Sequence, residues 1–159
     1  MPLSLFRVDD RLVHGQVVIG WGRPLAARFI VLVDDGVRES SWEQDLYRMA
    51  VPDDVQIFFA TTAEAIEHLG EWAADPRVGI LLTADLATMA ALHDAAPTLV
   101  RHVNLGGLHH RPGRVERLRY IFLADGDEAL LRRLGREGTD ISAQDLPTAA
   151  AVNLADLLR

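Results

Sequence analysis

The segment Arg7-Val-Asp-Asp-Arg-Leu-Val-His-Gly-Gln-Val17 gathers chemically useful side chains into one short stretch. His14 is its potential nucleophile, because a neutral imidazole keeps a nucleophilic ring nitrogen near neutral pH. Arg11 can offer a planar pair of N–H donors to phosphate oxygens. Either Asp9 or Asp10 could hydrogen-bond the imidazole ring or the guanidinium, whereas a second, free carboxylate would repel a phosphoryl group. These residue types make His14 a candidate for phosphoryl chemistry and leave the reaction open; at least one aspartate is expected to point away.

The two residues after the histidine extend the same site. Gly15 allows a close backbone approach, and Gln16 could add a side-chain amide donor. The first N–H groups of a helix that follows a strand are unpaired and favour an anion. Spacing alone still leaves open that His14 is an ordinary turn or capping residue.

Composition removes the commonest rival chemistries. All 16 basic residues are arginine, and the chain has no lysine and no cysteine. A P-loop lysine, a kinase lysine and a Schiff-base lysine are therefore excluded. Disulfides, thiolate nucleophiles and cysteine-bound metals are excluded as well. The net charge of −7, with arginines scattered among acidic residues, argues against nucleic acid as a partner.

The elements that must position these residues alternate between short apolar runs and helical patterns along all 159 residues. No repeat or linker interrupts them, so we expect one domain over residues 1–159. Continuous apolar runs favour parallel strands that are buried on both faces. The sequence therefore predicts an α/β fold: a doubly wound, mainly parallel sheet of six to seven strands with helices on both faces. Strands are expected at 3–8, 29–33, 55–59, 78–82, 100–103 and 120–123, with a weaker one at 140–143, and helices at 16–23, 40–49, 62–73, 84–95 and 127–136.

Several polar tips of these strands should share one edge of the sheet, where ligands of such folds bind. Most of them are expected to be turn and capping residues. The tip after the first strand holds His14, and the tip after the fifth reads Asn104-Leu-Gly-Gly107. We expect this second tip to be a tight turn beside the first loop, with glycines chosen for backbone conformation. Supporting roles are therefore assigned to Thr83, Asn104, Gly106 and Gly107.

The segment from Arg7 to Val17, followed by Trp21, closely resembles the opening of a known family. That family is the mannose/sorbose-type IIB component of the bacterial phosphoenolpyruvate-dependent sugar phosphotransferase system (PTS). Residues 29–34 and 78–83 resemble its second and fourth strands. The segment Val103-Asn-Leu-Gly-Gly107 is similar to its Asn-Ile/Leu-Gly-Gly turn, so that the resemblance covers essentially the whole chain.

The resemblance implies a phosphohistidine carrier. His14 would take a phosphoryl group on Nδ1 from a phosphorylated IIA protein, and would pass it to a sugar bound by membrane IIC and IID partners. Arg11 would stabilise the phosphoryl oxygens. Such a transfer needs mainly in-line positioning and charge stabilisation, so we expect no metal and no cofactor. The implied phosphate-binding loop comprises Asp9, Asp10, Leu12, Val13, Gly15 and Gln16.

Two alternative functions remain open. The chain could be a regulatory switch that is phosphorylated without taking part in transport, or a domain that binds an anion or nucleotide without covalent chemistry. The second alternative is disfavoured because neither a GxGxxG motif nor a P-loop occurs. The segment His109-His-Arg111 is expected to be a solvated loop, with partner docking as the other interpretation.

The expected location is the cytoplasm. No run of 18 apolar residues occurs, so the sequence predicts no membrane span. The charge at Arg7 comes too early for the apolar core of a signal peptide. Contact with the membrane is therefore expected only through partner proteins.

Overall fold

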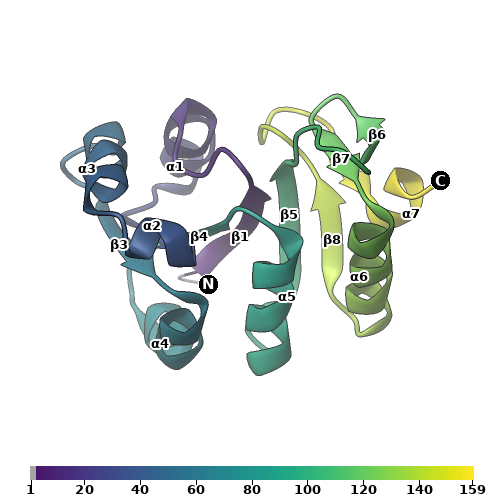
Figure 1. Cartoon of the computed structure of the whole chain (residues 1–159). Helices are drawn as coiled ribbons and strands as arrows, with labels where there is room; N and C mark the ends of the chain where they lie inside the picture. The colour runs from purple at the N-terminus through teal and green to yellow at the C-terminus, as the bar shows by residue number, and fades with distance from the viewer. Residues whose placement is uncertain (1–2) are drawn as a thin grey trace.

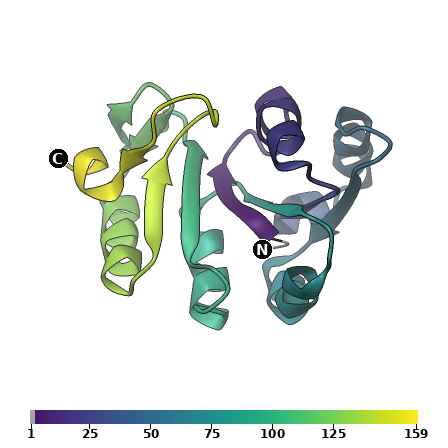
Figure 2. The same cartoon turned by 180° about the vertical axis from the view of Figure 1, so that it is seen from behind.

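A computed structural model describes residues 3–159; Met1 and Pro2, the start of the expected domain, lie outside the described residues. Its main sheet has seven strands in the order β3-β2-β4-β1-β5-β8-β9 (Figures 1 and 2). Neighbouring strands are parallel, except that β9 runs antiparallel to β8. The predicted α/β fold with a mainly parallel sheet is therefore confirmed. The strands are β1 (Leu3–Asp9), β2 (Phe29–Val33), β3 (Gln56–Ala60), β4 (Gly79–Thr83), β5 (His102–Gly107), β8 (Asp140–Ala143) and β9 (Val152–Asn153).

Local signals explain where the longer helices begin and end. Thr61 accepts a hydrogen bond from the backbone N–H of Glu64, whose side chain accepts one from Thr61, and this reciprocal cap starts α4. Asp85 caps α5 by accepting a hydrogen bond from the backbone N–H of Thr88. Gly138, at a φ of +94°, follows the end of α6. The helices are η1 (Gln16–Trp21, a π-helix), α1 (Gly22–Leu25), α2 (Asp35–Arg38), α3 (Ser41–Ala50), α4 (Thr62–Ala74), α5 (Leu86–Ala95), α6 (Asp125–Arg136) and α7 (Leu154–Leu157).

Two hydrophobic clusters lie on opposite faces of the sheet. One joins the sheet to α4, α5 and α6, through residues such as Leu69, Leu92 and Leu131. The other joins it to η1 and α2, through Val17 and Val37. Figure 1 shows α1 and α3 at the upper left and α4, α5 and α6 along the bottom. The strands between the clusters, such as β2 with five buried residues, match the continuous apolar runs of the sequence.

The β5–β8 part of the sheet differs, because Figure 2 shows no helix in front of these strands on the rear face. Their residues alternate accordingly. Val103, Leu105 and Ile141 face the cluster with α5 and α6. His102 and Asp140, which are paired across the two strands, are exposed. This alternation of polar and apolar residues is typical of strands with one solvated face, and it explains why 140–143 gave only a weak strand signal.

The structure corrects several predicted elements. The strand at 120–123 is outside the main sheet: β7 (Ile121–Leu123) pairs antiparallel with β6 (Val115–Leu118) in a separate two-stranded sheet. The helix predicted at 16–23 is divided into a π-helix and the short α1, which ends at Leu25, just beyond Pro24. Pro24 then lies in the first turn of α1, where a missing N–H costs little. The elements α2, β6, β9 and α7 were not predicted, since each is four residues or shorter.

Candidate active site

The loop after β1 lies at the carboxyl edge of the sheet, between β4 and β5. Val8, near the end of β1, is paired with Thr83 of β4 and with Leu105 of β5. The chain leaves β1 towards β2 on one side and later crosses from β4 to β5 on the other. Such a change of direction opens a crevice where ligands of doubly wound sheets bind. The predicted loop therefore lies at the expected ligand edge.

Asp9 is the electrostatic centre of this loop. Its side chain is fully buried, and its carboxylate accepts hydrogen bonds from Arg11 Nε at 3.1 Å and from Arg7 Nη2 at 3.3 Å. His14 Nε2 lies 3.0 Å from the same carboxylate. Burial alone would raise the pKa of Asp9, but the hydrogen bonds from His14 and Arg11 and the charge of Arg7 outweigh it and lower this pKa to about 2. Asp9 is therefore an anion held by three cationic or polar partners.

Arg7 is a site residue that sequence reasoning missed. It is fully buried and donates to the side chain of Asn104 at 2.5 Å and to the backbone carbonyls of Gln144 at 2.9 Å and Asp145 at 3.0 Å. Its guanidinium also stacks 5.2 Å from the ring centre of Trp21, whose indole N–H donates to Asp145. A charged residue inside an otherwise apolar strand was the available signal. Arg7 therefore restrains the Asp9 carboxylate, and it connects β1 to β5 and to residues 144 and 145, which follow β8.

The segment 104–107 is not the tight turn that the sequence predicted, because it belongs to β5. Its glycines are required by close approach rather than by backbone conformation. A Cβ at Gly106 would overlap the guanidinium of Arg7, and a Cβ at Gly107 would lie 2.9 Å from Oδ1 of Asp9. These two glycines thus make room for the buried Arg7–Asp9 pair.

His14 presents its two ring nitrogens to different surroundings. Nε2 faces the Asp9 carboxylate, so that a proton on this atom is held by the anion. Nδ1 faces the backbone N–H of Gln16 at 3.3 Å, a long hydrogen bond. The imidazole side chain is 20% exposed. A ring held by Nε2–H keeps its lone pair on Nδ1, the atom that the resemblance implied would be phosphorylated.

The helix that follows supplies fewer free N–H groups than expected. The backbone N–H groups of Val17 and Val18 both donate to the carbonyl of His14 at 3.0 Å. The N–H of Gln16 already faces His14 Nδ1. Anion binding at this site therefore depends more on side chains than on the start of η1.

The side chains of the other loop residues differ in their exposure and contacts. Arg11, whose side chain is 36% exposed, donates to both oxygens of Asp9 and to the side-chain oxygen of Gln16 at 2.8 Å. Leu12 and Val13 instead point into the hydrophobic cluster beneath η1. Leu12 adopts a left-handed conformation at a φ of +59°, which is uncommon for a residue with a branched side chain. A Cβ at Gly15 would meet no described atom within 4 Å, so this position is open.

Asp10 points away from His14 and binds a second histidine. Its Oδ2 accepts the backbone N–H of His109 at 2.8 Å, and its Oδ1 lies 2.5 Å from Nδ1 of the same residue. The backbone N–H of Asp10 donates to the carbonyl of Gly107 at 2.9 Å. His109 is half-exposed, as expected for a solvated loop. It is also tied to the loop between β1 and η1 (residues 10–15, here named the active loop), which its sequence position did not reveal.

Thr83 is buried at the neighbouring strand end, and its hydroxyl donates to the carbonyl of Asp85 at 3.1 Å. It therefore shapes the turn into α5. Asn104, by contrast, contacts the site through Arg7. Of the predicted supporting residues, Asn104, Gly106 and Gly107 lie against the Arg7–Asp9 pair. The hydroxyl of Thr83 instead bonds the turn into α5.

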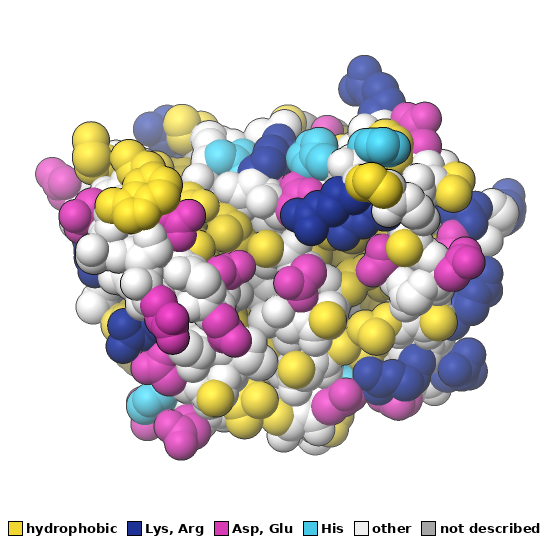
Figure 3. All heavy atoms as spheres, viewed as in Figure 1, with side chains coloured by type: hydrophobic (Ala, Val, Ile, Leu, Met, Phe, Trp, Pro, Cys, Tyr) yellow, Lys and Arg dark blue, Asp and Glu magenta, His cyan; other side chains and the backbone are white. Residues whose placement is uncertain are grey.

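The surface of this edge differs in charge from the acidic chain as a whole. Figure 3 shows histidine and arginine side chains gathered along the upper edge, over the ends of β1 and β5. Residues of this edge with exposed or partly exposed side chains include Arg11, His14 and His109. A partner that approaches His14 therefore meets cationic and imidazole groups on a chain of net charge −7.

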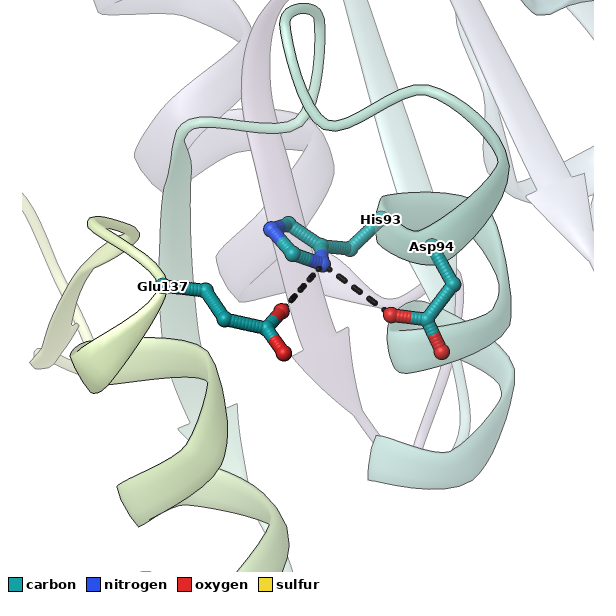
Figure 4. Close-up of side chains that lie close together, drawn as sticks. All are labelled: His93, Asp94 and Glu137. Atoms are coloured by element: carbon teal, nitrogen blue, oxygen red, sulfur yellow. Dashed lines mark hydrogen bonds and ion pairs between the residues drawn. The ribbon is translucent and has the colours of Figure 1, made fainter.

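A second group of titratable side chains lies far from this edge, at the ends of α5 and α6. Nδ1 of the buried His93 lies 3.3 Å from Asp94 and 3.7 Å from Glu137 (Figure 4). Three such ligands could hold a metal ion. However, Arg133 already binds both carboxylates, at 2.9 Å and 3.1 Å. The arrangement is best explained as an ion-pair cluster that joins the two helices.

The comparisons with known proteins agree with this architecture. The family described as "PTS system sorbose subfamily IIB component" matches residues 3–159. A sorbose-specific EIIB component of Klebsiella pneumoniae is 29% identical, over 98% of this chain and 94% of that protein. The N-acetylgalactosamine-specific enzyme IIB component 1 of Escherichia coli is 30% identical, over 91% of both chains. A mannose-specific EIIAB component of Escherichia coli is 24% identical over 99% of this chain, which spans 49% of that protein.

Solved structures show the same fold. The IIBSor domain of the sorbose permease from Klebsiella pneumoniae matches with a TM-score of 0.90, at 23% identity over 99% of this chain and 96% of that domain. The N-acetylgalactosamine-specific IIB component 1 of Escherichia coli matches with a TM-score of 0.87, at 27% identity over 95% and 98% of the two chains. No helix within residues 3–159 is long and apolar enough to cross a membrane. The chain belongs to the sorbose subfamily of PTS IIB components and is a phosphotransferase component of the mannose/sorbose type.

Proposed function

We propose that this chain carries a phosphoryl group on Nδ1 of His14, between a phosphorylated IIA protein and a sugar. The proposal rests on one observation: the two ring nitrogens of His14 have different hydrogen-bond partners. Nε2 faces the buried anion of Asp9 at 3.0 Å, whereas Nδ1 accepts a long hydrogen bond, of 3.3 Å, from the N–H of Gln16. The nucleophilic lone pair is therefore held at Nδ1.

In the proposed reaction, Nδ1 of His14 attacks the phosphorus of a phosphohistidine on the donor. The new N–P bond forms as the donor's N–P bond breaks, and the electron pair of that bond returns to the donor imidazole. The His14 ring gains positive charge as the bond forms. Asp9, whose lowered pKa of about 2 keeps it ionised at neutral pH, balances this charge through Nε2–H.

Arg11 is proposed to contact the phosphoryl oxygens. Its Nε and Nη2 are held by Asp9 and Gln16, which fixes the plane of the guanidinium. The side chain stays 36% exposed on the same edge as His14. Such fixed cationic donors stabilise transferred phosphoryl groups without a metal or nucleotide. The remaining loop residues, from Asp10 to Gln16, are proposed to hold this geometry.

The partners follow from family membership, which implies other PTS components. The name of the mannose-specific relative couples an A and a B component, which supports a IIA protein as the donor. We propose membrane IIC and IID components as the route to the sugar, with the reaction on the cytoplasmic side. The relatives' names differ in their sugars, sorbose, N-acetylgalactosamine and mannose among them, so the proposal names no particular sugar.

The test is transfer of labelled phosphate from a phosphorylated IIA protein to the whole chain. We expect rapid, acid-labile labelling of the wild type and of His110→Ala, and no labelling of His14→Ala. Because all three proteins keep the same core, circular dichroism should show equal folding. Labelling of His14→Ala at the wild-type rate would refute the proposal. Adding membranes with IIC and IID should then move the label to sugar.

A further inference from the structure

Asp10 holds one residue of another loop by two different groups. Its carboxylate accepts the backbone N–H of His109 through Oδ2, at 2.8 Å, and contacts the ring Nδ1 through Oδ1, at 2.5 Å. This double contact fixes both the position of the backbone and the rotation of the imidazole. The Asp10 side chain is 11% exposed and the His109 side chain 48% exposed, so that the contact lies at the surface of the protein.

The loop that carries His14 needs such a restraint. Leu12 lies in the left-handed region at a φ of +59°, which for a residue with a side chain costs about 1 kcal/mol or more. The loop is held from inside by Leu12 and Val13, which are buried, and by the Asp9 carboxylate. Asp10 provides the restraint from the outer side, where the loop would otherwise face solvent.

His109 is itself anchored to the body of the protein. Nη1 of Arg114 donates to the His109 carbonyl at 2.8 Å, and Nε of Arg114 lies 3.8 Å from Asp127 in α6. Residue 108, which precedes His109, pairs through its backbone with Tyr120 and Phe122. A chain of contacts thus runs from the active loop through Asp10, His109 and Arg114 to α6.

We propose that Asp10 and His109 form a positioning clamp that holds the active loop, and with it the His14 ring, in the geometry needed for phosphoryl transfer. The inference rests on the proposed function of His14. The clamp acts through the loop backbone, so that neither residue needs to contact the phosphoryl group. A misplacement of about 1 Å at a reacting atom can cost on the order of 100-fold in rate, so loop position is a sufficient means of control.

The adjacent histidine offers a matched control. His110 is also exposed, but its ring packs edge-on against Phe122, with 5.7 Å between the ring centroids. It differs from His109 in having no contact with Asp10 among those described. His109→Asn offers a rescue, because the asparagine amide nitrogen occupies the place of Nδ1 and can donate to Oδ1 of Asp10.

The experiment measures transfer from a phosphorylated IIA protein to the full chain, together with the ¹⁵N and ¹H NMR signals of the unphosphorylated His14 ring. We expect His109→Ala to lower kcat about tenfold at unchanged KM, and Asp10→Ala, which loses both contacts, to lower it further. His109→Asn and His110→Ala should stay within about twofold of the wild type. The His14 ring signals should shift in the first two variants alone.

Wild-type kcat and unchanged His14 signals in His109→Ala would overturn the clamp. So would a His109→Asn variant as slow as His109→Ala, or an equal loss in His110→Ala. Failure of the proposed function is recognised separately, because the wild type would then take up no phosphoryl group. The His14 ring signals would still test the clamp in that event.

Discussion

Asp9 and Asp10 are neighbours in the sequence, yet the structure gives them different tasks. Asp9 is fully buried and holds Arg7, Arg11 and His14. Asp10 is 11% exposed, and its carboxylate holds His109, a residue of another loop. Successive side chains at a strand end point to opposite sides, which separates the two carboxylates. In the proposed reaction, one aspartate supplies charge at His14, whereas the other positions the loop.

The two contacts should also differ in energy. The Arg7–Asp9 pair is removed from water, so loss of one partner leaves an uncompensated buried charge. The Asp10–His109 contact involves a half-exposed histidine, so that solvent can replace much of what is lost.

The substitution Asp9→Ala should destabilise the protein by about 3–5 kcal/mol, because it leaves the buried guanidinium of Arg7 without its counter-ion. Urea unfolding followed by circular dichroism measures this loss. The double variant Asp9→Ala/Arg7→Met should recover a large part of it, because no buried charge then remains. A single variant within about 1 kcal/mol of the wild type would show that Asp9 does not stabilise Arg7.

The substitution Gly106→Ala should cost about 2–3 kcal/mol, since a Cβ at this position would overlap the Arg7 guanidinium. Gly15→Ala is the matched control, because a Cβ there meets no described atom within 4 Å and the backbone φ is −54°. The same unfolding measurement compares the two. Equal stability of both variants would contradict the close approach of Arg7 to β5.

The lowered pKa of Asp9 predicts a specific dependence on pH. A carboxyl group with a depressed folded-state pKa stabilises the protein fully above its unfolded pKa, near 4, and loses that contribution as the pH falls through about 2. The free energy of unfolding of the wild type minus that of Asp9→Asn should therefore decrease by about 2 kcal/mol from pH 5 to pH 2. Other carboxylates cancel in this difference. A difference that does not change with pH would contradict the Asp9 network.

The substitution Asp10→Ala should cost only about 1 kcal/mol in the free energy of unfolding, because its partner is half-exposed. Expressed as an activation free energy, the loss in transfer rate should exceed this loss in the free energy of unfolding. Thermal unfolding of Asp10→Ala beside His109→Ala measures the first quantity. A loss as large as that of Asp9→Ala would mean that the two aspartates are structurally equivalent.

The pattern of apolar and polar residues along the chain predicted the part of the site that lies on one continuous segment, from β1 to His14. The strand before residue 9, the loop and the position of His14 at the carboxyl edge all follow from an apolar run and the polar residues after it. The environment of Arg7 could not be predicted in this way. Its partners Asn104, Gln144 and Asp145 are 97, 137 and 138 residues away, and they meet Arg7 only because β5 lies beside β1 and the segment after β8 folds back.

The same limit applies to His109 and to the glycines. The contact of His109 with Asp10 spans 99 residues, and nothing in the sequence around position 109 indicates it. The sequence assigns Gly106 and Gly107 to a turn that needs their backbone freedom. In the structure, these positions must be glycine because a guanidinium and a carboxylate of the neighbouring strand leave no room for a Cβ. Strands β6 and β9 were missed because short or half-solvated strands carry little apolar signal.

NMR of the phosphorylated, ¹⁵N-labelled protein tests the proposed role of His14 directly, because it identifies the ring nitrogen bonded to phosphorus. We expect a phosphorus–nitrogen coupling at Nδ1 of His14, with Nε2 still protonated beside Asp9. Phosphorylation of His14 at Nε2, or a phosphohistidine at any other position of the chain, would contradict it.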